Sequence, residues 1–590
     1  MKQLGLLLIC LFILGAGIRA IKIERPVNTP SWREADLSSI ARNYYREGMN
    51  LFAPRIDWRG SGPGYTEIEF PLYPWSIAVL HKIFGYHELF GRILAYIFSL
   101  IGLAIFLQLA RYLLPPAGAV AASLFYVLSP LAIFISTAIH AEGLMFLCYL
   151  AAAYFFIRWI DSRSNKHYVI ALIATALTIL TKATAAHIGI FFALLVLSQI
   201  GWSALREAKI WFFAIGSLLP AAAWYYYAHQ LWLSYGNSMG LSNENHWVGT
   251  DFFSHAEFIT GIVRLDVSNV WMPAGVVIAA LGLLFRWKDR AVRYALCWAI
   301  SVGIFYVVAA RTTSDAWANY YHIFAVPAAA LLVGAGAEVI RQLRTSAKLV
   351  RSFFAFSITS AVALVIATFI PFIVEALGGY AKWLPKLSLL LVGVAITTAA
   401  LFLFRSDAAD AATEKETAKN RVMMQTLIGF AAAGCLCLTF FLQLNEIQRD
   451  INRHDRRLFA CADSFSSYMT DKTLILASGG ECQDPTGKPV AYNSSYMFYW
   501  LDRKGFNVCE EEQSLESVRS FIAQGVAYFV AEKTAMQKKP GFEAAMRANY
   551  QVVRECDAAI LFGLLATTSE QSGQSATAWN GFSMLGEFRR

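Results

Sequence analysis

The chain has 590 residues, of which 57% are hydrophobic, and a formal net charge of +9. This apolar fraction excludes a soluble globular protein of such length and indicates a polytopic helical membrane protein. The positive charge does not indicate a nucleic-acid partner, because Lys and Arg lie in short clusters between apolar segments, as in the cytoplasmic loops of membrane proteins.

Thirteen apolar segments have the length and composition of transmembrane helices. They lie near residues 4–20, 90–110, 117–135, 143–160, 168–182, 187–203, 210–228, 270–285, 294–310, 321–338, 353–372, 387–404 and 424–442. Basic clusters follow every second segment, which places the N-terminus in the cytoplasm and, after an odd number of spans, the C-terminal region outside. The first segment also resembles a signal peptide ending near Ala20, but Arg19 is unfavourable beside a cleavage site, and we expect the segment to be retained.

We expect a transmembrane domain over residues 1–444, a small extracytoplasmic α/β domain over 445–566 and a flexible polar tail over 567–590. Short apolar runs predict the strands of the α/β domain, and helical spacing of apolar residues predicts a helix at 515–522. The expected strands are 473–477, 526–531, 550–553 and 559–564.

Four of the nine cysteines lie in the expected extracytoplasmic domain, at Cys461, Cys482, Cys509 and Cys556. An even number of cysteines in an oxidising compartment predicts at least one disulfide, with three possible ways of pairing all four.

The first outer loop, residues 21–89, contains two segments expected at the membrane surface. Apolar side chains recur at helical spacing over residues 32–47, which predicts an amphipathic interfacial helix that ends at Gly48. The recurring residues are Leu37, Ile40, Ala41 and Tyr44. A second interfacial segment is expected at residues 69–84.

The start of the first interfacial helix carries two candidate catalytic carboxylates. Ser31 and Glu34 have the spacing of a capping box, so a structural role for Glu34 competes with a catalytic one. Asp36 favours the helix dipole, but its position just outside the bilayer also suits a general base acting on a lipid-linked substrate.

Further along the loop, Glu67 and Glu69 alternate and would share one face of an extended segment. The neighbouring prolines and aromatic residues, including Tyr73, predict a rigid segment facing the membrane. We expect Glu67, Glu69 and Tyr73 to contact substrate, although a solvated loop remains the simpler alternative.

Three ionisable residues end apolar segments on the expected outer side. Glu142 follows His140 in a tight turn, and Lys182 and Arg311 occupy positions where outer loops rarely carry a cation. A bound phosphate group would explain both cations, and structural ion pairs are the alternative. His322 is either a hydrogen-bonded core residue or a phosphate or metal contact.

These motifs, in this order, resemble a known family. WREADLSSIARNYYREG, GYTEIEFPLYPW, IHAEG, LTKATA and YYHIFAVP are similar to the bacterial members of the dolichyl-phosphate-mannose protein mannosyltransferase superfamily. These are C-type glycosyltransferases and include lipid A aminoarabinose transferases. The resemblance covers residues 1–340 well and the remainder only in general layout.

The resemblance implies inverting transfer of a sugar from a polyprenyl-phosphate-linked donor to an extracytoplasmic glycan, lipid or protein. By position, Asp36 would be the catalytic carboxylate, with Glu69 and Glu142 as further acidic positions. Many family members have Asp-Glu where this chain has Arg33-Glu34, which leaves Glu34 and Asp36 as alternative bases, and we favour Asp36.

The departing phosphate needs cations, for which we nominate Lys182 and Arg311, together with His322. No nucleotide cofactor is expected, but some family members bind a divalent metal, and Glu69 with His322 are its candidate ligands here. The enzyme would lie in the inner membrane of a bacterium, among membrane lipids, with its active site and C-terminal domain on the periplasmic side. A polyprenyl-lipid or small-molecule transporter or flippase is the alternative, and a non-catalytic scaffold is a third reading.

Overall fold

The computed structural model describes residues 2–21, 23–27, 32–343, 359, 362, 456–484, 486–492 and 495–565. Apart from residues 359 and 362, the three spans expected after residue 352 lie outside these ranges, as does the tail expected at 567–590.

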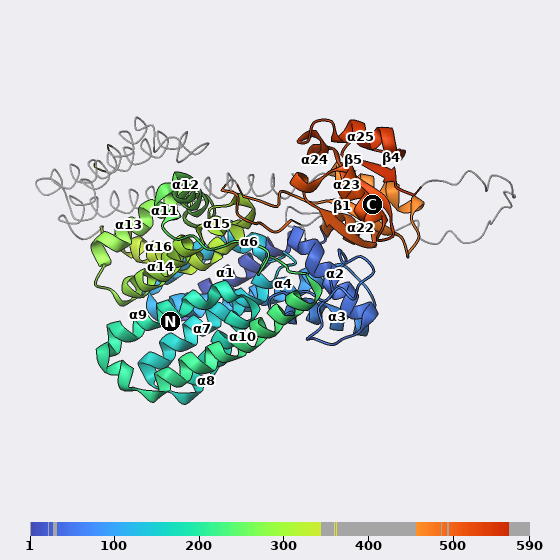
Figure 1. Cartoon of the computed structure of the whole chain (residues 1–590). Helices are drawn as coiled ribbons and strands as arrows, with labels where there is room; N and C mark the ends of the chain where they lie inside the picture. Colours follow the sequence, from blue (N-terminus) through green and yellow to red (C-terminus); the bar gives the residue numbers. More distant parts are fainter. Residues whose placement is uncertain are drawn as a thin grey trace, which may run out of the picture.

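The N-terminal part of the chain forms a bundle of helices, and the C-terminal domain lies at one end of it (Figure 1). The bundle helices are α1 (Lys2–Ala20), α4 (Leu89–Leu113), α5 (Pro116–Val127), α6 (Pro130–Ile135), α7 (Ala141–Ser162), α8 (Asn165–Thr181), α9 (Ile188–Ile200), α10 (Ala208–Tyr235), α13 (Pro273–Arg286), α14 (Arg290–Val308) and α16 (Val326–Leu343). Shorter helices connect them: η1 (Ala183–His187), η2 (Gly201–Arg206), α11 (Asp251–Ser254), α12 (Ala256–Leu265), η3 (Asp266–Trp271), α15 (Ala310–Thr313) and η4 (Ala316–Ala325).

Each of the first ten expected spans coincides with helical structure, but not each with one long helix. Among the described residues, six helices are long and apolar enough to cross a membrane, or seven if the helices on either side of a 90° bend near Met272 form one span. The third expected span is divided between α5 and α6, since Pro130 begins a new helix after Ser129. The expected total of thirteen spans is therefore not confirmed.

Close packing of α5 against α16 depends on two glycines. A side chain at Gly334 would place its Cβ 2.6 Å from the backbone oxygen of Gly118, and one at Gly118 would lie 2.8 Å from the oxygen of Gly334. Small residues allow this approach between apolar helices, which have no hydrophobic driving force for association within lipid.

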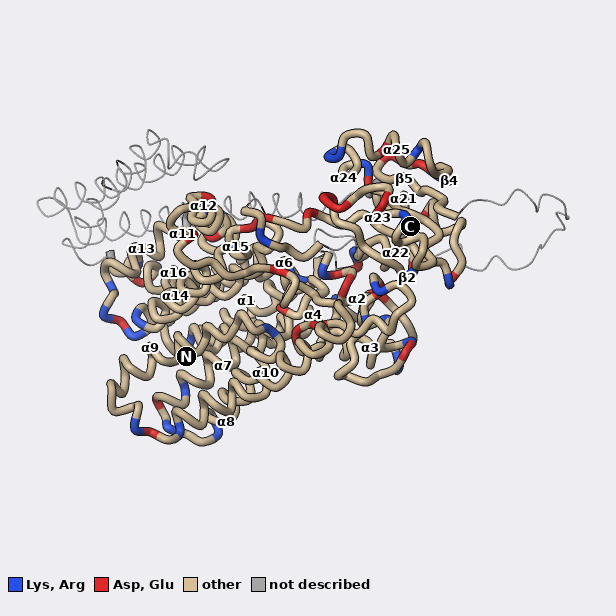
Figure 2. The backbone as a smooth tube through the Cα atoms, in the orientation of Figure 1, with Lys and Arg blue, Asp and Glu red and all other residues tan. Residues whose placement is uncertain are grey.

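Charged residues in the turns between helices gather at the end of the bundle away from the C-terminal domain (Figure 2). There Tyr112 donates a hydrogen bond to Asp161, which also pairs with Arg290, and Arg163 pairs with Glu207 at 2.9 Å. These residues come from four different turns, so the clusters that alternate in the sequence do meet at one end.

The first outer loop contains α2 (Trp32–Glu47) and α3 (Leu72–Phe84). The bounds of α2 match the expected interfacial helix, and its position on the membrane surface stays a prediction. The apolar face of α2 is buried. Polar residues elsewhere on the helix are buried too, against the bundle at Glu34 and against the C-terminal domain at Arg42. The buried polar residues of α2 are Arg33, Glu34, Asp36, Ser38, Ser39, Arg42 and Asn43.

The C-terminal domain is a five-stranded sheet with strand order β2-β1-β3-β5-β4. Strands β2, β1 and β3 are parallel, and β5 runs antiparallel to both β3 and β4. Its elements are α21 (Arg456–Phe465), η6 (Ser466–Tyr468), β1 (Leu474–Ser478), α22 (Ser495–Leu501), β2 (Lys504–Val508), η7 (Glu510–Glu512), α23 (Leu515–Ile522), β3 (Val526–Glu532), α24 (Lys533–Gln537), α25 (Phe542–Asn549), β4 (Gln551–Glu555) and β5 (Ala559–Gly563).

The four expected strands and the expected helix are confirmed, and β2 is an additional strand. Its sequence, Lys-Gly-Phe-Asn-Val, lacks the apolar run of a buried strand because β2 lies at the edge of the sheet. The expected disulfide is also confirmed, since Cys461 pairs with Cys556 and Cys482 with Cys509.

Ion pairs hold this domain on the transmembrane part of the chain at two places, in addition to hydrogen bonds such as that from the Asn245 N–H to the backbone oxygen of Pro489 at 2.9 Å. At the first outer loop, Asp502 pairs with Arg42 at 3.1 Å and with Arg46 at 2.8 Å. At the second site, Arg311 pairs with Asp484 of the C-terminal domain. The domain therefore bridges segments that lie more than 250 residues apart in the sequence.

Candidate active site

Glu34 is locked in a buried ion pair at the start of α2. Arg92, in the first turn of α4, donates to both carboxylate oxygens at 3.0 Å, and the backbone N–H of Ile139 donates at 3.1 Å. Burial alone would raise the pKa of Glu34, but the Arg92 and Arg25 cations outweigh it and lower the pKa to about 2. A carboxylate held this way is a weak base, since bidentate bonds to Arg strongly favour its ionised form.

Asp36 lies two residues further along α2 and is also buried. The indole Nε1–H of Trp58 donates to its Oδ1 at 3.2 Å. Tyr496 from α22 of the C-terminal domain packs against the apolar cluster around α2. Desolvation raises the pKa of this tyrosine, and the carboxylates Glu34 and Asp36 raise it further. Asp36 therefore lies where the first outer loop meets the C-terminal domain.

A chain of alternating buried charges extends from α2 into the bundle. Arg33 lies 3.3 Å from Glu69, Lys182 lies 3.0 Å from the same Glu69 oxygen, and Lys182 lies 2.8 Å from Glu142. Burial raises the pKa of Glu69, but Arg33 and Lys182 outweigh it and lower the pKa below its usual value. We call these four residues the ion network, and three of them, Glu69, Glu142 and Lys182, are among the expected site residues.

Aromatic and imidazole rings enclose the ion network. The Lys182 ammonium lies 4.8 Å from the ring centre of Tyr321 and 5.5 Å from that of Tyr320. His140 is fully buried, with its Nδ1 3.4 Å from Glu142 and its ring edge-on to Tyr320. These neighbours place the network in an environment of low dielectric, where each charge interacts strongly with an added ion.

Arg311 does not contact the ion network. Its guanidinium pairs with Asp251 at 3.1 Å, pairs with Asp484, and donates to Thr486. The expectation that Lys182 and Arg311 grip one phosphate is not supported, because the two cations contact different partners. The outward position of Arg311 reflects an ion pair with another domain, which was the alternative interpretation of its sequence position.

His322, Tyr73 and Glu67 also have partners that indicate structural roles. His322 bonds to Asp266 and to the backbone oxygen of Thr313, each at 2.8 Å. The Tyr73 hydroxyl donates to the backbone oxygen of Gly91 at 2.7 Å. These hydrogen bonds agree with the alternative of a hydrogen-bonded core residue for His322. The expected contacts of His322 with the donor phosphate and of Tyr73 with substrate stay predictions.

Glu67 joins the first outer loop to residues 238–242, which follow α10. Its carboxylate accepts hydrogen bonds from the hydroxyl of Ser238 and from both the backbone N–H and the hydroxyl of Ser242. The backbone N–H of Met239 donates to the backbone oxygen of Glu67 at 2.9 Å. This arrangement fixes the loop that follows α10. The expected contact of Glu67 with substrate stays a prediction.

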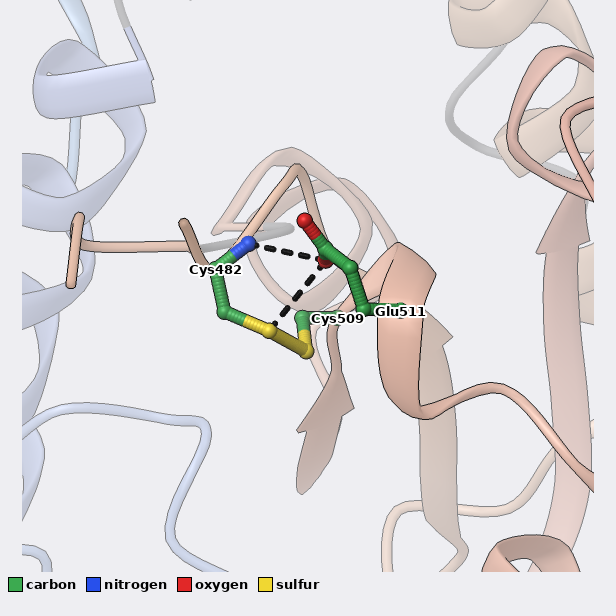
Figure 3. A group of neighbouring side chains, drawn as sticks. All are labelled: Cys482, Cys509 and Glu511. Atoms are coloured by element: carbon green, nitrogen blue, oxygen red, sulfur yellow. Dashed lines mark hydrogen bonds between the residues drawn. A yellow bond between two sulfur atoms is a disulfide. The ribbon is translucent and has the colours of Figure 1, made fainter. Parts of the chain in front are cut away.

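The expected metal ligands do not fit a shared ion. Glu69 is paired with Arg33 and Lys182, and both ring nitrogens of His322 are bonded elsewhere. Within the described ranges, one group of side chains has metal-like spacing, namely Cys482, Cys509 and Glu511. Figure 3 shows these two cysteines joined as a disulfide, with the Cys482 backbone N–H donating to Glu511 at 2.9 Å, so they offer no thiolate ligand.

Arg92 and Trp58 are two site residues that the sequence analysis missed. Arg92 carried a usable signal, because it is a cation at the outer end of an apolar segment, as Lys182 is. Trp58 carried none, because its link to Asp36 depends on the tertiary fold. Arg33 was noted only as a departure from the family pattern, yet it begins the ion network.

The comparisons with known proteins agree with the sequence motifs. Residues 68–227 match the family model described as dolichyl-phosphate-mannose-protein mannosyltransferase. This range contains Glu69, Glu142 and Lys182 of the ion network. No curated protein matches the chain.

Solved structures extend the likeness over nearly the whole chain. The fold is similar to that of ArnT from Cupriavidus metallidurans in the apo state, with a TM-score of 0.56, 15% identity and coverage of 95% of this chain and 97% of that one. For the same protein bound to undecaprenyl phosphate the TM-score is 0.54 and the identity 14%, with coverage of 96% of this chain and 98% of that one. The fold is also similar to that of the oligosaccharyltransferase AglB from Archaeoglobus fulgidus, in complex with an inhibitory peptide and a dolichol-phosphate. Here the TM-score is 0.50 and the identity 12%, with coverage of 92% of this chain and 72% of that one.

The resemblance to the C-type glycosyltransferases is thus confirmed by the family model over part of the chain and by the fold over most of it. The chain is a membrane protein with the architecture of that class.

Proposed function

We propose that this protein is an inverting membrane glycosyltransferase, which moves a sugar from a polyprenyl-phosphate-linked donor to an acceptor hydroxyl outside the cytoplasm. The observation that carries the proposal is the placement of Asp36 next to the ion network, with Arg33 one helical turn before it on α2. Two of the similar structures contain lipid phosphates, undecaprenyl phosphate in ArnT and a dolichol-phosphate in AglB, which supports a lipid-phosphate donor.

Asp36 is the proposed general base. Its carboxylate takes the proton of the acceptor hydroxyl while that oxygen attacks the anomeric carbon of the donor sugar. The bond between this carbon and the lipid-phosphate oxygen breaks, and the phosphate leaves with the electron pair. Attack opposite the leaving group inverts the configuration. Glu34 is the weaker candidate, because its pKa of about 2 reflects a carboxylate already committed to Arg92.

Lys182 is the proposed cation for the leaving phosphate. The ion network holds two cations and two carboxylates, so its formal charge is balanced before the donor binds. A phosphate that displaces one carboxylate from Lys182 exchanges one charge-assisted bond for another within a buried site. No step of the proposed reaction runs through a metal ion.

The test is transfer by purified protein supplied with polyprenyl-phosphate sugars and candidate acceptors. We expect release of polyprenyl phosphate together with a glycosylated product, whereas a flippase would move the lipid without breaking this bond. Asp36→Asn keeps the shape of the side chain and should lower transfer by about 100-fold to 10,000-fold, as loss of a general base does.

Glu24→Gln is the matched control, because Glu24 is an exposed acid of the same outer loop. It should retain wild-type transfer. Near-normal transfer by Asp36→Asn would reject Asp36 as the base. If the wild-type protein cleaves the sugar–phosphate bond of none of the supplied donors, the proposed donor class is rejected.

A further inference from the structure

Residues 57–60 of the first outer loop run along the edge of the C-terminal sheet. The backbone N–H of Gly505 in β2 donates to the oxygen of Asp57 at 3.1 Å, and the N–H of Gly60 donates to the oxygen of Gly505 at 2.7 Å. An open sheet edge offers such main-chain partners to an extended segment. These two bonds bracket Trp58, so β2 fixes the backbone on both sides of this residue.

The side chain before Trp58 is fixed as well. Asp57 is buried and accepts hydrogen bonds from Arg42 and Asn43 of α2, each at 2.8 Å. Arg42 also donates to the backbone oxygen of Tyr499 at 3.0 Å and pairs with Asp502. The same guanidinium therefore ties Asp57 to the C-terminal domain.

The indole of Trp58 lies between the two parts of the protein. Its ring packs against the apolar cluster around α2 and against the core of the C-terminal domain. From this position its Nε1–H donates to Asp36 at 3.2 Å. The hydrogen bond restrains one oxygen of the carboxylate that the proposed function assigns as the base.

We propose that Trp58 is a positioning residue for Asp36, and that the C-terminal domain acts on sugar transfer by holding Trp58 in place. The inference rests on the proposed function. A misplacement of about 1 Å in a catalytic geometry costs up to about 100-fold in rate. An enzyme whose base loses one restraining hydrogen bond but keeps its charge should therefore turn over more slowly, while the donor still binds.

Trp58→Phe tests this, because it keeps an aromatic ring and removes the N–H donor, and its loss of ring volume is matched by the same change in the control. We expect kcat to fall about tenfold with the donor KM within about twofold of wild type. Trp75→Phe is the control, because Trp75 lies in the same outer loop and its indole N–H donates to the backbone oxygen of Met49 at 2.9 Å, away from Asp36. Wild-type kcat in Trp58→Phe, or an equal fall in Trp75→Phe, would overturn the proposal.

A second variant tests the link to the C-terminal domain and serves if Trp58→Phe does not fold. Asp502→Asn weakens the contact of Arg42 with this domain at a half-exposed side chain. We expect kcat to fall about threefold without a change in donor KM, and no further fall when the substitution is added to Trp58→Phe, because residues in one chain of contacts act non-additively. Unchanged kcat in Asp502→Asn, or independent multiplicative effects of the two substitutions, would contradict the proposal.

The Asp36→Asn variant separates this proposal from the proposed function. If Asp36→Asn is inactive and Trp58→Phe has wild-type kcat, the positioning role of Trp58 fails while the function stands. If Asp36→Asn transfers normally, Asp36 is not the base, and the positioning role of Trp58 fails while the proposed sugar transfer stands.

Discussion

Glu34 and Asp36 are two residues apart on α2, yet their surroundings give them different chemistry. Glu34 faces the bundle and receives a bidentate bond from Arg92, whereas Asp36 faces Trp58 at the junction with the C-terminal domain. A helix turns about 100° per residue, so two positions separated by two residues point in nearly opposite directions. Glu34 is thereby committed to an ion pair with Arg92, whereas Asp36 is the carboxylate that we propose as the base.

This difference predicts a pH-dependent effect of Glu34→Gln on stability. Its folded pKa of about 2 lies below the ordinary value of 4.5, so the contribution of the Glu34–Arg92 pair is complete above pH 4.5 and is lost as the pH falls toward 2. At neutral pH the variant leaves Arg92 buried without its partner, which costs about 3 to 5 kcal/mol. Thermal unfolding in detergent should show a large difference from wild type at neutral pH that shrinks in acid. A difference independent of pH would contradict the assignment.

The sequence predicted which ionisable residues lie at the outer ends of the apolar segments better than it predicted their partners. Glu69, Glu142 and Lys182 were chosen for their position at the outer ends of apolar segments, and they do meet in one buried network. Arg311 and His322 were chosen by related arguments and have partners elsewhere. Membrane topology constrains the depth of a residue in the bilayer, but the lateral packing of helices decides which residues become neighbours.

Among the elements, α2 shows most clearly what a pattern can and cannot predict. Its bounds follow from helical spacing and from Gly48, and both were predicted. Its surroundings were not, because an amphipathic helix covered by a second domain has the same apolar stripe as one lying on lipid. Arg42 and Arg46 of α2 pair with Asp502, and Arg42 also donates to the backbone oxygen of Tyr499. No local pattern in the sequence indicates such distant partners.

The helix α21 and the hairpin β4–β5 are joined by the disulfide Cys461–Cys556, which closes a loop of 95 residues. The disulfide Cys482–Cys509 closes a loop of 27 residues. In the chain-entropy model the longer loop gives the larger stabilisation, by about 1 kcal/mol. We expect removal of the first pair by Ser substitution to lower the stability of the domain by about 2 to 5 kcal/mol.

Chemical unfolding of the two double-Ser variants checks this order. Alkylation of the denatured, unreduced wild-type protein should label none of these four cysteines. Labelling of all four, or a larger loss from the pair with the shorter loop, would contradict the prediction.

For the whole molecule, the ion pair between Arg311 and Asp484 is the second point at which the C-terminal domain is held. Arg311→Met should loosen this contact and increase hydrogen exchange in residues 479–492, while the donor KM stays within about twofold of wild type. Asp484→Asn removes the other partner and should give the same result, since breaking either side of an ion pair loses the same interaction.

The comparison of these two variants also tests the discarded phosphate role. A donor KM raised more than about tenfold in Arg311→Met but not in Asp484→Asn would return Arg311 to the donor site, because a charge-assisted contact contributes about 1.5 to 3 kcal/mol.

The burial of α2 beneath residues 499–505 has a consequence for biogenesis. Arg42 and the backbone of Tyr499, which share a hydrogen bond, are separated by 457 positions in the chain. A ribosome adds about 5 to 20 residues per second, so the segment that covers the helix with Asp36 is synthesised tens of seconds after the helix itself. During this interval the helix exposes charged side chains that the finished protein buries. The surroundings of the proposed base Asp36 are therefore among the last parts of the molecule to form, and we expect a chain stalled before residue 499 to lack sugar transfer.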